Sequence, residues 1–65
     1  MSIIIPTDVY DEDGNMLRIE YYDTAGSHIC DVVWDDQDEQ TSENRQFLRE
    51  WGAKMMEQKG YQVAK

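Results

Sequence analysis

The chain has 65 residues, 40% of them hydrophobic, and a formal net charge of −8. So short a chain buries only a small part of its surface, so we expect one domain, residues 1–65, with too little core to wall a catalytic pocket. The negative charge disfavours direct binding to nucleic acid or to an anionic membrane.

Cysteine usage and the N-terminus indicate the compartment. Cys30 is the lone cysteine, so it cannot form an internal disulfide, whereas short secreted chains usually carry several. The first ten residues hold three consecutive isoleucines without a preceding basic region, which predicts neither a signal peptide nor a membrane span. We therefore expect a cytoplasmic protein.

Three strands are predicted in the first half of the chain. Residues 3–10 are rich in β-branched side chains, and Pro6, which has no N–H to donate, predicts an edge strand. A turn at residues 11–15 leads to a strand over residues 16–23, and a second turn leads to a strand over residues 28–35. Alternation places one set of apolar side chains of the middle strand on the buried face: Leu17, Ile19 and Tyr21.

The strand register follows from placing like side chains opposite each other. A three-residue loop, residues 12–14, pairs Val9 with Leu17 and sets Asp8 against Arg18, whereas a two-residue loop would set Asp8 against an isoleucine and is disfavoured. Across the second turn, the preferred register gives the pairs Leu17–Trp34, Ile19–Val32, Tyr21–Cys30 and Asp23–His28.

A helix is predicted from about Ser42 to Gln58, with Thr41 or Ser42 as its N-cap and Gly60 as a C-terminal cap. Helical spacing places an apolar stripe on one side, Phe47, Leu48, Trp51 and Met55, and sets Arg45, Arg49 and Met56 opposite. The expected fold is α+β, a three-stranded antiparallel β-meander packed on one C-terminal helix.

Two segments carry weak signals for metal chemistry. Residues 11–15 partly match a calcium loop, but Val9 takes the first ligand position and the flanks read as strands, so we expect a hairpin turn. His28 and Cys30 are two apart on a strand and should share a face, yet the chain has no other His or Cys to complete a site. No metal and no cofactor are expected.

The sheet face that points away from the helix has no second helix to cover it. Apolar side chains and carboxylates are expected to be interleaved on this face. The expected apolar residues are Tyr10, Met16, Tyr22, Ile29 and Val33, and the expected acids are Asp8, Glu20, Asp31 and Asp35. Such a mixture is the usual build of a protein interface. It could serve a foreign partner or a homodimer.

Charge is concentrated in the first 40 residues, which hold eleven acids and one base. We therefore expect a non-enzymatic binding module for a protein with a basic surface, such as an inhibitor of a nucleic-acid enzyme that acts as a partial DNA mimic, a role typical of phage and mobile-element accessory proteins. The alternative is a small assembly protein that forms homo-oligomers through the open sheet face. The candidate partner-binding residues are Tyr10, Glu20, Tyr22, Asp31, Val33, Asp35, Asp36, Asp38 and Glu39.

Overall fold

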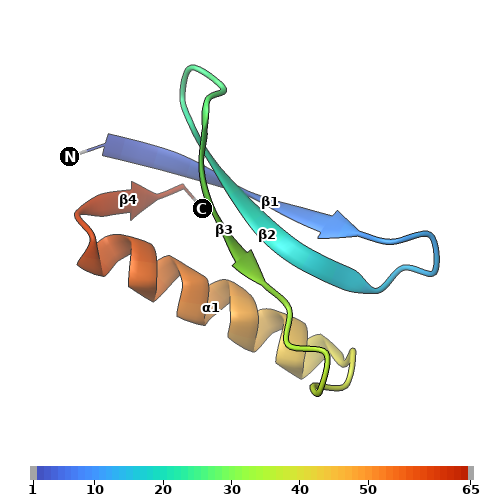
Figure 1. Ribbon diagram of the computed structural model, residues 1–65. Helices are drawn as coiled ribbons and strands as arrows, with labels where there is room; N and C mark the ends of the chain where they lie inside the picture. Colours follow the sequence, from blue (N-terminus) through green and yellow to red (C-terminus); the bar gives the residue numbers. More distant parts are fainter. Residues whose placement is uncertain (1, 65) are drawn as a thin grey trace.

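The computed structural model describes residues 2–64 and has an α+β fold, with one helix on one face of a four-stranded mixed sheet (Figure 1). The elements in chain order are β1 (Ser2–Tyr10), β2 (Met16–Asp23), β3 (His28–Val33), α1 (Ser42–Gln58) and β4 (Tyr61–Val63). The strand order is β3-β2-β1-β4, and only the β1–β4 pair is parallel. The predicted class is confirmed, but the three-stranded meander is wrong because the sheet has a fourth strand.

The fourth strand forms where the chain reverses after α1. Gly60 has a φ of 97°, as its predicted capping role requires, and β4 then runs beside residues 2–4 of β1. This makes β1 an internal strand rather than the predicted edge. The pairing with β4 ends at Ile4, before Pro6, so the missing N–H of the proline interrupts no bond to β4.

The two hairpins of the sheet share one turn design. An aspartate at the start of each turn, Asp11 or Asp23, accepts hydrogen bonds on its carboxylate from two backbone N–H groups of the same turn, at 2.8 to 3.0 Å. The third residue after each aspartate is a glycine with positive φ, Gly14 at 82° and Gly26 at 87°, a conformation that side chains disfavour. The predicted three-residue loop at residues 12–14 is therefore confirmed.

A bulge at Leu17 changes the register between β1 and β2. Tyr10 pairs with Met16, as the loop requires, but Val9 then pairs with Arg18 instead of Leu17. The side chains of β1, Tyr10 included, therefore lie on the sheet face opposite to the predicted one, because strand side chains alternate. The pairing of an aspartate with an isoleucine, disfavoured above, is the one that forms: Asp8 lies opposite Ile19.

A matching bulge at Ile29 follows the second turn. Because of it, His28 pairs with Tyr22 rather than with Asp23. Further along, the predicted register between β2 and β3 is confirmed, with the pairs Ile19–Val32 and Tyr21–Cys30, and Trp34 N–H donates to the Leu17 carbonyl at 3.0 Å.

The core lies between the sheet and α1. It consists of seven buried apolar residues: Ile4, Met16, Ile19, Tyr21, Val32, Trp34 and Met56. Leu17, expected to be buried, is exposed, and Met16, expected on the open face, is buried instead. Both corrections follow from the bulge, which turns Met16 toward the helix.

The helix has the predicted bounds and the predicted cap, with Thr41 Oγ1 accepting from the Asn44 N–H at 3.0 Å, but it presents a different face to the sheet. Phe47 and Trp51, expected in the core, are 66% and 45% exposed, and Gly52 is buried instead. The cause is steric. A Cβ at Gly52 would overlap the Tyr21 hydroxyl oxygen, so the glycine lets the helix approach the sheet on that side.

Candidate functional site

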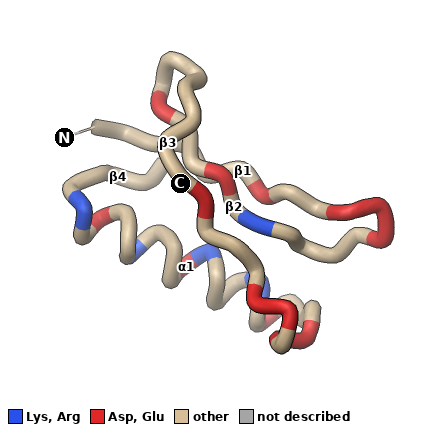
Figure 2. The backbone as a smooth tube through the Cα atoms, viewed as in Figure 1, with Lys and Arg blue, Asp and Glu red and all other residues tan. Residues whose placement is uncertain are grey.

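The acidic end of the molecule combines two segments that are distant in sequence: residues 11–13 in the first hairpin turn and residues 35–39 in the loop before α1 (Figure 2). A hollow with a volume of about 550 Å³ lies between them, and its lining includes Asp11, Asp36 and Asp38. Four of the predicted partner-binding residues lie in the loop segment: Asp35, Asp36, Asp38 and Glu39. Sequence reasoning missed the contribution of Asp11, because only the hairpin geometry brings it to the same hollow.

The loop of the acidic end is fastened to β2 by polar contacts. The Gln40 side-chain amide accepts from the Met16 N–H and donates to the Met16 carbonyl, both at 2.9 Å. Trp34 Nε1 donates to the Asp38 carbonyl at 3.3 Å, and Arg45 Nη1 donates to the Gln40 carbonyl at 2.8 Å. A loop held in this way loses less freedom when it binds a partner, so its carboxylates are preorganised.

Three ion pairs form within residues 2–64, and none of them uses a carboxylate of the acidic end. Arg18 pairs with Glu20 at 2.7 Å, and Arg49 pairs with Asp8 at 2.9 Å. In the third, His28 Nε2 lies 2.6 Å from the carboxylate of Asp31. Within residues 2–64 no ion pair includes an acid of the acidic end. Arg18 also lines the hollow, but its guanidinium is paired with Glu20, and the three aspartates there outnumber it, so the hollow attracts cationic groups.

The open face of the sheet, on the side away from α1, brings together four other predicted residues: Glu20, Tyr22, Asp31 and Val33. The Tyr22 hydroxyl donates to Glu20 at 2.5 Å, and Arg18 Nε donates to the same carboxylate at 2.7 Å. These two hydrogen bonds, that of Tyr22 first, lower the pKa of Glu20, and the bond to Glu20 raises the pKa of Tyr22. Glu20 is therefore held as a carboxylate by its neighbours.

Tyr10 does not join the open face, which corrects the prediction. The Leu17 bulge turns it to the helix side together with Asp8, where Arg49 Nη2 donates to the Tyr10 hydroxyl at 3.1 Å. The apolar residues that β1 places on the open face are instead Ile3, Ile5 and Val9, of which the two isoleucines are exposed. No alternation rule could identify them without knowledge of the bulge.

His28 and Cys30 lie on opposite faces of the sheet, because the Ile29 bulge separates them. His28 Nε2 lies 2.6 Å from the Asp31 carboxylate, and Cys30 Sγ lies 3.3 Å from Met56 Sδ. The shared site expected from their spacing does not form. In the part of the chain that the structure describes, no group of three or more His, Cys, Asp or Glu residues is arranged to hold a metal ion.

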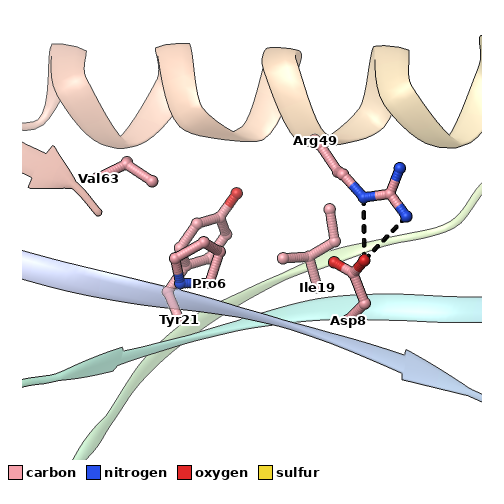
Figure 3. A pocket seen from close by; sticks show the side chains of 6 residues that line it. All are labelled: Pro6, Asp8, Ile19, Tyr21, Arg49 and Val63. Atoms are coloured by element: carbon pink, nitrogen blue, oxygen red, sulfur yellow. Dashed lines mark hydrogen bonds and ion pairs between the residues drawn. The ribbon is translucent and has the colours of Figure 1, made fainter. Parts of the chain in front are cut away.

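A cavity of about 340 Å³ separates α1 from the sheet (Figure 3), lined by Pro6, Asp8, Ile19, Tyr21, Arg49 and Val63. Arg49 and Asp8 face each other across it, with Arg49 Nε donating to Asp8 Oδ2 at 2.9 Å. Burial acts to lower the pKa of Arg49, but the hydrogen bond and charge of Asp8 outweigh this and raise it. Burial raises the pKa of Tyr21 and keeps its hydroxyl protonated. The two charges compensate each other, so the pair ties the helix to β1.

Comparison of the chain with protein-family models, with characterised proteins and with solved structures finds no significant match. Among the residues described, α1 is neither long nor apolar enough to cross a membrane.

Proposed function

We propose that the protein is a non-enzymatic binding module that engages a basic surface of a partner protein through the acidic end. One observation carries the proposal: carboxylates from two separate segments, those of Asp11, Asp36 and Asp38, line one hollow, and none of them is in an ion pair within residues 2–64. Negative charge focused on a concave surface raises the association rate with a cationic partner and disfavours anionic ones.

The partner class that fits this surface best is a nucleic-acid-binding enzyme, whose phosphate site is basic. Duplex DNA carries one charge per about 1.7 Å. A single β-strand cannot reach this charge density, because its residues on the same face are about 6.6 Å apart. Two acidic segments around one hollow approach that density more closely than either does alone. The proposed role is that of an accessory inhibitor, such as a phage or mobile element would encode, that occupies part of the phosphate site.

The test compares two variants with equal loss of charge. Asp36→Asn with Asp38→Asn removes two of the three carboxylate charges that line the hollow, whereas Glu50→Gln with Glu57→Gln neutralises two exposed acids of α1 and serves as the control. Within residues 2–64 neither the Asp36 nor the Asp38 carboxylate accepts a hydrogen bond, and Glu50 accepts one exposed bond, from Gln46 Nε2, that a glutamine oxygen can also accept. Both variants should therefore fold.

Immobilised wild-type protein and both variants are incubated with a cell lysate, and retained proteins are identified by mass spectrometry with and without added duplex DNA. The proposal predicts that the wild type and the α1 control both retain a basic nucleic-acid-binding protein. The variant with Asp36→Asn and Asp38→Asn should not retain it, and added duplex DNA should displace it from the wild type. Equal retention by both variants, or retention that DNA leaves unchanged, would contradict it.

A further inference from the structure

The strand β3 forms an edge of the sheet that can accept another strand. In the strand order it has a neighbour only in β2, and no segment within residues 2–64 pairs with its other side. The backbone of Trp34 bonds toward β2, through its N–H and the Leu17 carbonyl. Because backbone groups alternate in direction along an antiparallel strand, the N–H and C=O groups of Asp31 and Val33 point outward.

An apolar shelf lies beside this edge on the helix side. A hollow of about 220 Å³ separates β3 from α1, and its walls include Val32 of the strand and Trp51 and Met55 of the helix. Trp51 and the neighbouring Phe47 are the exposed aromatic residues of α1. The apolar surface of the helix therefore extends past the last strand, as it would in a two-layer fold that lacked one strand.

We propose that the β3 edge binds an extended segment of a partner protein as a fifth strand, with apolar residues alternating with lysine or arginine. Side chains of an added strand alternate between the two faces of the sheet. Those on the helix side would pack on Trp51 and Met55, which favours apolar residues. Those on the open side would lie beside Asp31 and near Asp36, which lines a hollow together with Val33, and this favours basic ones.

A second copy of this chain is a poorer occupant of the edge, because each copy carries a net charge of −8 and the copies repel. The inference rests on the proposed protein-binding role and names the form in which the partner binds. Val33 and Asp36 also line the acidic hollow, but the variants below change the Val33 backbone and Trp51 and keep the carboxylates of the hollow, so the two proposals can fail separately.

The probe is an acetylated and amidated octapeptide of alternating valine and lysine, added to isotopically labelled protein. Amide hydrogen exchange read by NMR should slow by at least about tenfold at Asp31 and Val33, while amides of the opposite edge, such as Gln62, stay unchanged. The same peptide with all of its backbone amide nitrogens methylated, or with glutamate in place of lysine, should give no protection. Protection by the glutamate peptide, or binding without protection of Asp31 and Val33, would overturn the proposal.

Two variants of Val33 isolate the edge. Val33→Pro removes the outward N–H but no bond to β2, and should raise the Kd for the peptide by at least about tenfold, whereas Val33→Thr keeps the N–H and should change it less than about threefold. Trp51→Ala tests the shelf independently if the proline variant does not fold, and should also weaken binding at least about tenfold. Unchanged affinity in both Val33→Pro and Trp51→Ala would refute the inference. A dimer of the free protein that Val33→Pro dissociates would assign the edge to a second copy and overturn the foreign occupant.

Discussion

The contact between Gly52 and Tyr21 determines how α1 sits on the sheet, and replacing the glycine tests it. In an exposed helix, Gly→Ala stabilises by about 1 kcal/mol through backbone entropy. Here the new methyl group would overlap the Tyr21 hydroxyl oxygen and lie 3.3 Å from Val32 Cγ2, and overpacking of this kind costs about 1–3 kcal/mol. Gly52→Ala should therefore be neutral or destabilising by up to about 2 kcal/mol, the difference between the two terms.

Tyr21→Phe removes the obstructing oxygen, for which the described residues provide no hydrogen-bond partner. In that background Gly52→Ala should become stabilising by up to about 1 kcal/mol, because the propensity term remains and most of the overlap is gone. Thermal or urea unfolding of the four proteins measures the coupling, and 1 kcal/mol corresponds to about 4–8 °C in Tm for a domain of this size. Equal stabilisation by Gly52→Ala in both backgrounds would refute the packing of α1 through Gly52.

Three further predictions test the core, the open face and the first turn. Trp34→Ala should destabilise by about 3–5 kcal/mol, since Trp34 is 8% exposed, whereas Trp51→Ala, at a 45% exposed position, should cost about 1 kcal/mol or less; similar melting of both variants would contradict the assigned helix face. Because the pKa of Glu20 is lowered in the folded state, the stability it contributes is present above its ordinary pKa and is lost as pH falls through the lowered value. The stability advantage of wild type over Glu20→Gln should thus be constant above the ordinary pKa of glutamate and shrink as the pH falls below it, and a pH-independent difference would contradict this. Calcium at about 1 mM should leave Tm unchanged, because Val9 stands at the first ligand position and strands rather than helices flank the turn, and calorimetric binding would contradict this.

Local signals in the sequence predicted the local structure. The turn at residues 12–14 follows from the Asp-Gly pattern, and the helix bounds follow from the Thr41 cap and Gly60. The pairing of Ile19 with Val32 also followed from matching like side chains. Each of these inferences uses residues that are adjacent or directly opposed.

The prediction of strand register fails where a bulge residue shifts the pairing of every residue after it. Leu17 and Ile29 each insert one residue into a ladder, and neither bulge has a sequence signal stronger than an ordinary apolar residue. The helix face was predicted wrongly because the apolar stripe through Trp51 was assumed to face the sheet. Gly52 instead allows the helix to approach the sheet closely, and a pattern of apolar and polar residues does not reveal this role of a glycine. The strand β4 is three residues long, too short for a period to be recognised.

For the candidate site, the sequence identified the acidic loop but not its partner segment. The cluster at residues 35–39 is visible as composition, whereas the hollow that it shares with Asp11 depends on the Gln40 amide that binds the Met16 backbone. Tyr10 was misassigned through the same bulge that turned Asp8 toward Arg49. The predicted and observed sites thus differ because the long-range contact between the Gln40 amide and the Met16 backbone was not predicted.

The central claim, that the acidic end recruits a basic partner, is tested most directly by the salt dependence of the association rate constant with the captured protein. Charges that steer association are screened beyond a Debye length of about 8 Å at physiological ionic strength, so the rate constant of the wild type should fall steeply as salt rises. The slope of its logarithm against the logarithm of salt concentration should be shallower for Asp36→Asn with Asp38→Asn and unchanged for Glu50→Gln with Glu57→Gln. Equal slopes for the two variants would contradict the claim.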